Sequence, residues 1–186
     1  MFAEMEESGL DAACESRKQS VITYGPVEIA HKGYRFLITM KPTHAGMMEY
    51  LHEMRIHNVQ TVVKLCEENY DTKTLTNNGV AVLDMSFPDG KPPPDSVIEE
   101  WFKVLTTSRG TNTNACVAVH CVSGLGRAAV LVAIALIELG LKYEDAVEII
   151  REKRRGAINS RQLEFLKKYK RRHRLENDKS KSCIIC

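Results

Sequence analysis

The sequence has no run of about 18 apolar residues, the length of a membrane-spanning helix, and no apolar segment opens it. We therefore expect neither a spanning helix nor secretion by a signal peptide. Its six cysteines (positions 14, 66, 116, 121, 183 and 186) lack the paired spacing of zinc ligands. We expect no metal site and no cofactor.

Net charge is also low, at +2, but it is unevenly distributed. Residues 1–16 contain five acidic residues and no Lys or Arg, whereas residues 167–182 contain eight Lys or Arg. With 186 residues, 44% of them apolar, the chain suits one globular domain with short tails. We predict a flexible acidic leader over 1–24, a domain over 25–170 and a basic tail over 171–186.

Apolar patterns predict strands that alternate with helices. Strands are expected at 27–29, 34–40, 59–65, 80–87 and 117–120, and helices at 45–57, 128–139 and 144–154, with a last helix starting near 159. Ser96 and Glu99 have the spacing of a capping box and predict the start of a further helix. This alternation predicts an α/β sandwich, in which helices flank a central, mostly parallel sheet.

The most informative stretch is 120–127, which lies between a predicted strand and a predicted helix. Cys121 and Arg127 are separated by five residues, which are Val122, Ser123, Gly124, Leu125 and Gly126. A loop at a helix N-terminus can turn its backbone N–H groups onto an anion, and an arginine can bind two phosphate oxygens at once. The same positive environment favours the thiolate of Cys121, which is the nucleophilic form. The segment 121–127, called the anion loop below, therefore predicts cysteine-dependent phosphoryl transfer.

The anion loop also has two other interpretations. A single cysteine before a glycine-rich turn is often only a small buried residue, and a rhodanese-type sulfur-transfer loop also places a cysteine at such a site. His120 before the cysteine and Arg127 at the end of the loop favour a phosphatase. A reduced, intracellular setting suits a working thiolate.

Phosphoryl transfer to a thiolate also needs an acid for the leaving group. Asp89 lies in a loop rich in Pro and Gly after a predicted strand, and Gly90 gives this loop freedom to close. The alternative for Asp89 is a simple Asp-Gly turn, and Asp84 is expected to be structural. His120 either orients the thiolate or is a core histidine. Gln162 either positions a hydrolytic water or lies on a helix surface.

Cys66 and Cys121 each follow a predicted strand. If these strands are parallel neighbours about 4.8 Å apart, both cysteines lie at the same edge of the sheet, within the separation that a disulfide tolerates. Oxidation could then store Cys121 reversibly as a Cys66–Cys121 disulfide. The alternative for Cys66 is an inert buried thiol.

The sequence ends in Cys183-Ile184-Ile185-Cys186, the pattern of a prenylation signal. A terminal Cys is atypical, so the type of prenyl group stays open. One lipid together with the basic cluster at 167–174 gives the two signals that stable anchoring to an anionic membrane requires. We expect the cytoplasmic face of the plasma membrane and endosomes, and the cytosol or nucleus without the lipid. Nucleic-acid binding is not expected, because the tail offers no stacking aromatic beyond Tyr169.

These motifs together resemble the phosphatases of regenerating liver (PRL), prenylated members of the dual-specificity protein tyrosine phosphatases. The resemblance runs from about Tyr34 to the last residue, and the matching segments are 34–39, 66–72, 84–93, 120–128, 142–147, 154–157, 159–160, the basic tail and the prenylation signal. It implies that Cys121 is the nucleophile, Arg127 the phosphate ligand, Asp89 the general acid and Cys66 the regulatory disulfide partner. It also implies trimers at the membrane and binding to cyclin M-type magnesium transporters.

Some positions differ from related enzymes. Ala128 matches the PRL family but replaces the Ser or Thr of most tyrosine phosphatases, a hydroxyl that helps to expel the thiolate, so slow hydrolysis of the phosphoenzyme is expected. Ala129 stands where the family usually has Pro. Residues 85–89 (Met-Ser-Phe-Pro-Asp) replace the usual Trp-Pro-Phe-Asp-Asp. The acidic leader is an extension.

The sequence therefore predicts a membrane-anchored phosphatase of phosphoproteins that works through a cysteinyl-phosphate. Because of Ala128, one alternative stays open: a slow-turnover binding module that docks an acidic segment of a membrane transporter. Phosphoinositide hydrolysis is less favoured, because the anion loop contains no additional basic residue between Cys121 and Arg127.

Overall fold

The computed structural model describes residues 25–67 and 70–175. Its elements are β1 (Val27–His31), β2 (Tyr34–Met40), α1 (Met47–Ile56), β3 (Val59–Lys64), α2 (Lys73–Thr76), β4 (Ala81–Asp84), α3 (Asp95–Thr111), β5 (Cys116–Cys121), α4 (Arg127–Glu138), α5 (Tyr143–Lys153) and α6 (Ser160–Lys168). The acidic leader and the prenylation signal lie outside the described residues.

The strands form one five-stranded sheet in the order β1-β2-β5-β3-β4. β1 and β2 form an antiparallel hairpin, and the β2–β5, β5–β3 and β3–β4 pairs are parallel. The mostly parallel sheet flanked by helices is therefore confirmed. β5 lies between β2 and β3, and all of its residues are buried.

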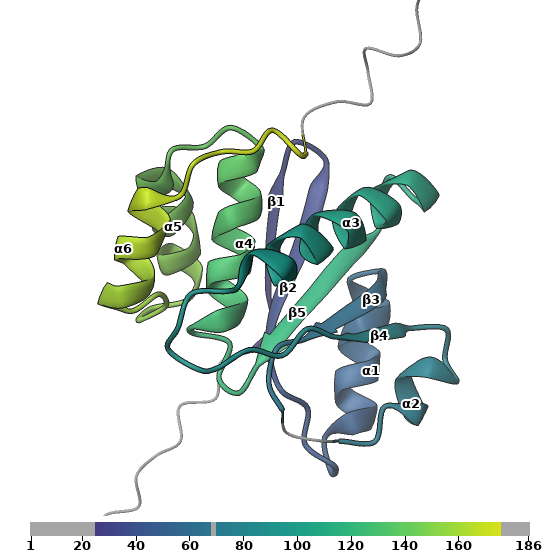
Figure 1. Cartoon of the computed structure of the whole chain (residues 1–186). Coiled ribbons are helices and arrows are strands. Elements are labelled where there is room, and N and C mark those ends of the chain that lie inside the picture. The colour runs from purple at the N-terminus through teal and green to yellow at the C-terminus, as the bar shows by residue number, and fades with distance from the viewer. Residues whose placement is uncertain (1–24, 68–69, 176–186) are drawn as a thin grey trace, which may run out of the picture.

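The two faces of the sheet are covered by different helices. Because side chains alternate along a strand, Leu37 and Ala118 pack with α1 and α2, whereas Ile38 and Val119 pack with α3 and α4. α4, α5 and α6 lie side by side next to α3 (Figure 1). This two-sided burial explains why the strands are apolar on both faces.

Helix α4 forms the centre of the larger core. Each of its residues is buried, as expected of an apolar helix that is covered by the sheet on one side and by other helices elsewhere. It begins at Arg127, the last residue of the anion loop and one residue before the predicted start at 128. Across the described residues, no helix is long and apolar enough to cross a membrane.

Two local predictions were wrong. Helix α3 begins at Asp95, its N-cap is Pro94, and Ser96 lies inside the first turn without a capping role. Pro94 fixes φ at −62° in an extended conformation that leads directly into a helix, so the helix starts before Ser96. The strand predicted at 80–87 is confined to β4, because residues 85–94 turn away as the Asp89 loop.

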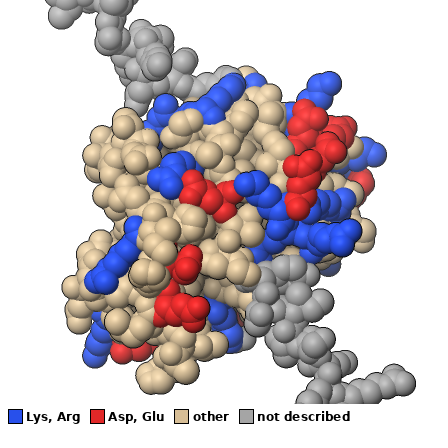
Figure 2. Space-filling model, turned by 180° about the vertical axis from the view of Figure 1, so that it is seen from behind, with Lys and Arg blue, Asp and Glu red and all other residues tan. Residues whose placement is uncertain are grey.

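Three residues of the basic cluster at 167–174 are held against the rest of the domain. The buried Glu138 of α4 accepts hydrogen bonds from the Tyr169 hydroxyl at 2.7 Å and from the backbone N–H groups of Arg172 and Arg174 at 2.6 and 3.0 Å. The Arg172 guanidinium also forms ion pairs with Asp95 and Glu99 of α3. On the face opposite to Figure 1, acidic and basic side chains lie interspersed (Figure 2).

Candidate active site

The carboxyl ends of three parallel strands bring the site together. In the sheet register, Met40 of β2 lies opposite Cys121 of β5, and Lys64 of β3 lies opposite His120. The N–H of Leu65, just after β3, donates to the His120 carbonyl at 3.0 Å. Cys121 therefore lies at the edge of the sheet where ligands of α/β proteins usually bind.

The anion loop turns back on the cysteine sulfur. The N–H of Gly124 donates to Cys121 Sγ at 3.2 Å. Gly124 has φ +72°, and a Cβ there would lie 2.6 Å from the Thr39 carbonyl oxygen. Only glycine fits both the left-handed conformation and this close approach.

Neighbouring segments hold the carbonyl groups of the loop. The Val122 carbonyl accepts the Lys41 N–H at 3.3 Å, the Leu125 carbonyl accepts the Ile158 N–H at 2.9 Å, and the Gly126 carbonyl accepts the Val130 N–H at 3.0 Å. Carbonyl groups held in this way fix the orientation of the loop peptides, and this is the form of backbone that binds anions.

Arg127 connects the anion loop to the Asp89 loop. Its Nη1 donates to the Leu65 carbonyl at 2.9 Å and to the Phe87 carbonyl at 3.0 Å. Its Nε lies 3.1 Å from Asp89 Oδ1 in an ion pair, although the N–H does not point directly at that oxygen. The Arg127 side chain is 6% exposed and that of Asp89 is 73% exposed. An exposed carboxylate thus lies at the Nε edge of a buried guanidinium.

Gln162 is part of this site and does not lie on the helix surface. It is fully buried, and it forms a capping box with Asn159 at the start of α6, with bonds of 2.8 and 3.1 Å. A Cβ at Gly126 would lie 3.1 Å from Gln162 Nε2 and 3.8 Å from Asp89 Oδ1. Within the described residues, Gln162 Nε2 has no hydrogen-bond partner. An amide donor and a carboxylate therefore lie close together beside Gly126.

His120, which directly precedes Cys121, is a neutral core histidine. Its Nε2 lies 2.8 Å from the Tyr70 hydroxyl, and its Nδ1 lies 3.5 Å from the Cys121 carbonyl oxygen. Burial lowers the pKa of His120 to about 4. A neutral ring suits an acceptor for the Tyr70 hydroxyl on one side and a donor to the Cys121 carbonyl on the other. Desolvation in turn raises the pKa of Tyr70.

The three described cysteines are free thiols in different environments. Burial raises the pKa of Cys66, and the nearby Arg127 partly opposes that effect. Cys66 follows β3 and Cys121 ends β5, so the parallel neighbours assumed from the sequence are present. Cys116 lies at the opposite end of β5, where burial raises its pKa to about 12.

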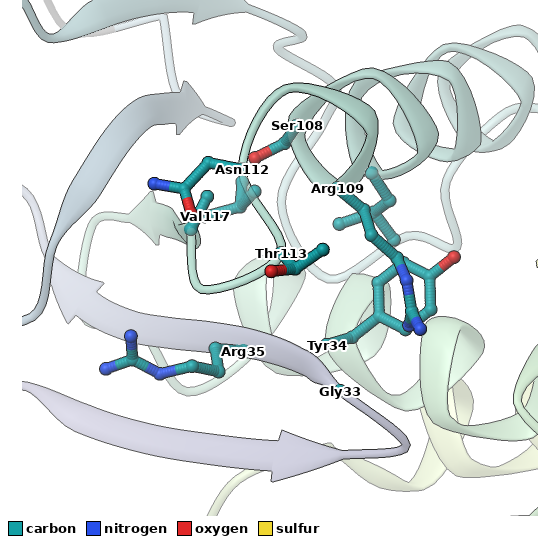
Figure 3. A pocket seen from close by; sticks show the side chains of 10 residues that line it. Gly33, Tyr34, Arg35, Ser108, Arg109, Asn112, Thr113 and Val117 are labelled. Atoms are coloured by element: carbon teal, nitrogen blue, oxygen red, sulfur yellow. The ribbon is translucent and has the colours of Figure 1, made fainter.

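A cavity elsewhere is too small to be the substrate site. It has a volume of about 10 Å³ and lies at the amino ends of β2 and β5, among residues of α3 (Figure 3). There Arg109 stacks on the ring of Tyr34 at 4.5 Å. This volume holds about one water molecule.

In the described residues no group of three His, Cys, Asp or Glu side chains could hold a metal ion.

Arg154 and Tyr70 belong to the site but had no role assigned from the sequence. Both lie in segments that match the PRL pattern, which was the only signal for them. Arg154 is fully buried, and its Nη1 donates to the Ser123 carbonyl of the anion loop at 3.0 Å.

Comparisons with known proteins agree with this geometry. A family model described as a DSP-PTPase phosphatase of polymorphic toxin systems matches residues 38–141. The chain is 52% identical over 170 residues to the PRL-1 phosphatase of Drosophila melanogaster, which covers 90% of this chain and 97% of that protein. It is 47% identical over 165 residues to the human protein tyrosine phosphatase type IVA 3, which covers 86% of this chain and 95% of that protein.

Solved structures of other phosphatases have the same fold. A protein tyrosine phosphatase from Leishmania major superposes with a TM-score of 0.67 at 37% identity, over 74% of this chain and 89% of that one. A structure of PTPMT1 in complex with PI(5)P has a TM-score of 0.60 at 26% identity, over 71% of this chain and 87% of that one. The chain belongs to the PRL family of dual-specificity protein tyrosine phosphatases and is a phosphatase.

Proposed function

We propose that this PRL phosphatase hydrolyses phosphoproteins through a phosphate ester of Cys121, with Arg127 as the phosphate ligand and Asp89 as the proton donor. The observation that carries this proposal is the anion loop, in which the Gly124 N–H donates to Cys121 Sγ and the loop closes on Arg127. Residues 122–126 supply backbone N–H groups to the phosphate oxygens, and the helix dipole of α4 adds to the attraction.

In the first step the Cys121 thiolate attacks phosphorus, and the bond from phosphorus to the substrate oxygen breaks. Asp89 gives a proton to that oxygen as it leaves. In the second step water attacks the same phosphorus, the P–S bond breaks, and Asp89 takes the proton of the water. Phosphate departs and the thiolate is regenerated.

The carbonyl groups of Leu65 and Phe87 both accept from Arg127 Nη1. Arg127 therefore presents its Nε edge to the phosphate. That edge faces Asp89 in the structure. Asp89 must therefore move away from Arg127 when phosphate enters, and the Phe87 carbonyl bond holds the base of its loop in place. We further propose that Gln162 Nε2, beside Gly126, donates to the hydrolytic water.

Ala128 is buried and supplies no hydroxyl group to stabilise the departing thiolate. We expect formation of the phosphoenzyme to be faster than its hydrolysis. The alternative of a binding module corresponds to the extreme of this imbalance, in which the loaded loop turns over too slowly to matter.

The test is Cys121→Ser with Cys116→Ser as its matched control, since both cysteines are buried on β5. Cys121→Ser should abolish hydrolysis of an aryl phosphate and leave tungstate binding measurable by calorimetry, because the N–H groups and Arg127 remain. Cys116→Ser should keep both. Full activity of Cys121→Ser would refute the proposal.

Location and regulation follow as further parts of the proposal. A prenyl group on Cys183, outside the described residues, would anchor the phosphatase to anionic membrane at the cytoplasmic face. The basic cluster at 167–174 would add the electrostatic attraction to that membrane. We also propose that Cys66 and Cys121 form a disulfide on oxidation, and that the protein forms trimers at the membrane and binds a magnesium transporter, as the resemblance to the PRL family implies.

A further inference from the structure

The peptide group between Ser123 and Gly124 is held on both of its sides. Its N–H donates to Cys121 Sγ at 3.2 Å, and its carbonyl accepts Arg154 Nη1 at 3.0 Å. A planar trans peptide points these two groups in opposite directions. Arg154 therefore lies behind the peptide whose other side faces the sulfur.

The charge of Arg154 acts on the same hydrogen-bonded chain. A charged donor on a carbonyl makes a stronger hydrogen bond than a neutral donor. A peptide polarised at its carbonyl becomes a better donor at its N–H, because hydrogen bonds in series strengthen one another. An anionic sulfur gains from this more than a neutral thiol does.

Arg154 is held in a position from which it can polarise the Ser123–Gly124 peptide. It is fully buried, and its Nη2 donates to the carbonyls of Gly25 at 3.0 Å and Ile38 at 3.2 Å. A Cβ at Gly124 would lie 2.9 Å from Arg154 Nη1. The guanidinium thus packs against the loop backbone, and the planar fork reaches three carbonyls that an ammonium group could not.

The turn after Arg154 contains a residue with a strained backbone that supports the anion loop. Ile158, a β-branched residue, has φ +64°, a conformation that is costly for such side chains. Its N–H bonds the Leu125 carbonyl at 2.9 Å, and its own carbonyl accepts Arg151 Nη2 at 2.8 Å. The connection between α5 and α6 therefore keeps an unfavourable backbone where it supports the anion loop.

We propose that Arg154 is a positioning residue for catalysis, which orients and polarises the Ser123–Gly124 peptide so that its N–H stabilises the Cys121 thiolate. This inference rests on the proposed role of Cys121 as nucleophile. Arg154 touches neither substrate nor sulfur, and it acts only through the peptide group.

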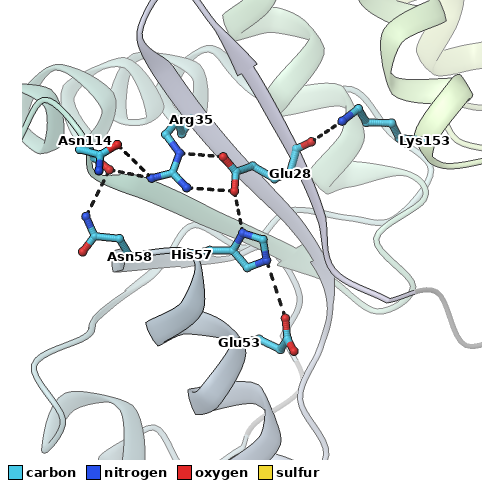
Figure 4. A network of polar contacts seen from close by, with 7 residues as sticks. All are labelled: Glu28, Arg35, Glu53, His57, Asn58, Asn114 and Lys153. Atoms are coloured by element: carbon cyan, nitrogen blue, oxygen red, sulfur yellow. Dashed lines mark hydrogen bonds and ion pairs between the residues drawn. The ribbon is translucent and has the colours of Figure 1, made fainter.

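The test uses Arg154→Gln, Arg154→Lys and a matched control, Arg35→Gln. Arg35 also donates to a main-chain carbonyl, that of Asn114 at 2.8 Å, but it lies in the network around Glu28 at the far end of β2 (Figure 4). The full chain is alkylated with iodoacetamide from pH 4 to 9, and the rate at Cys121 is read by peptide mass spectrometry. Urea unfolding of each variant gives its stability.

We expect Arg154→Gln to move the Cys121 profile to higher pH by about one unit, a tenfold loss of thiolate at a fixed low pH. Arg154→Lys, which keeps the charge but not the fork, should recover part of that shift. Arg35→Gln should lower stability without moving the profile.

An unchanged profile in a folded Arg154→Gln would overturn the proposal. If that variant does not fold, Arg154→Lys decides by the same criterion, and failure of both to fold would assign Arg154 to the fold alone. An equal shift in Arg35→Gln would show general loosening and would also overturn it. If wild-type Cys121 showed no reactivity until alkaline pH, the proposed nucleophile would fail instead, so the two failures are distinguishable.

Discussion

Replacing Asp89 by Ala should separate phosphate binding from proton transfer. The Asp89 carboxylate lies 3.1 Å from Arg127 Nε, but its side chain is 73% exposed. An exposed ion pair contributes about 0.2–1 kcal/mol. The fold should therefore lose no more than this in urea unfolding.

In the proposed mechanism the same ion pair opposes phosphate binding, because both anions use the Nε edge of Arg127. Without the carboxylate, tungstate should bind Asp89→Ala about 1.4- to 5-fold more tightly, the equivalent of the free energy of the pair. Isothermal titration calorimetry on both proteins at one ionic strength measures this change. Unchanged or weaker binding would contradict competition at Arg127.

Catalysis should change in the opposite direction. General-acid assistance is worth about 10²- to 10⁴-fold, and it matters most for leaving groups that cannot depart as anions. In single turnover, Asp89→Ala should slow phosphoenzyme formation from phenyl phosphate by that factor and from a nitrophenyl or fluorinated coumarin ester only slightly.

Asp84→Ala is the matched control for both measurements. Asp84 ends β4, a few residues before Asp89, and its ion pair is with Lys64 at 2.7 Å. It should give a flat dependence on the leaving group. An equal loss across the series in Asp89→Ala would show that Asp89 is only a turn residue, as the Asp-Gly pair would then suggest.

Three other outcomes are expected. The pKa of His120 is lowered to about 4 in the fold, so the unfolded chain takes up this proton first as pH falls. The free energy of unfolding should therefore be highest above pH ~6.5 and decrease by up to about 3 kcal/mol towards pH 4. Urea titrations of His120→Gln should lack this decrease. Peroxide should produce a Cys66–Cys121 disulfide that a dithiol reverses, and peptide mapping that found only sulfinic acid at Cys121 would refute it. Cys183→Ser should leave the membrane fraction almost completely, whereas neutralising the cations of 167–171 should give a partial, salt-sensitive loss; membrane association of Cys183→Ser in high salt would exclude the prenyl anchor.

The central part of the fold and the place of the anion loop between β5 and α4 could be predicted from the sequence, because both are local patterns. The apolar run of β5, the glycines of 124 and 126 and the apolar start of α4 follow one another within a short segment. Backbone preference and side-chain chemistry point to the same structure there. One of the two wrong predictions, the start of α3, came from a capping pattern at Ser96 that Pro94 outweighed.

The support of the loop could not be predicted in this way. Arg154 and Gln162 reach the anion loop from a connection about 30 residues further along the chain, and Lys41 reaches it from the end of β2. Their contacts depend on how α5 and α6 pack, which no local pattern encodes. A glutamine at a helix start is usually exposed, and only the packing of α6 shows that Gln162 is buried.

The two halves of the site differ in how firmly they are held, and this bears on what the protein does. The anion loop is supported by Lys41, Arg154 and Ile158, so the groups that capture phosphate are present before substrate arrives. Asp89, by contrast, is exposed, and in the proposed mechanism it must leave Arg127 before it can give a proton to the substrate oxygen. Phosphate capture is therefore preorganised, whereas proton transfer needs a loop movement in each step.

With no hydroxyl at position 128 to assist the departure of the thiolate, the phosphoenzyme should accumulate. A rapid-mixing experiment with an aryl phosphate should then show a burst of one equivalent of alcohol, followed by slow turnover, and a linear trace without a burst would place the slow step before the phosphoenzyme.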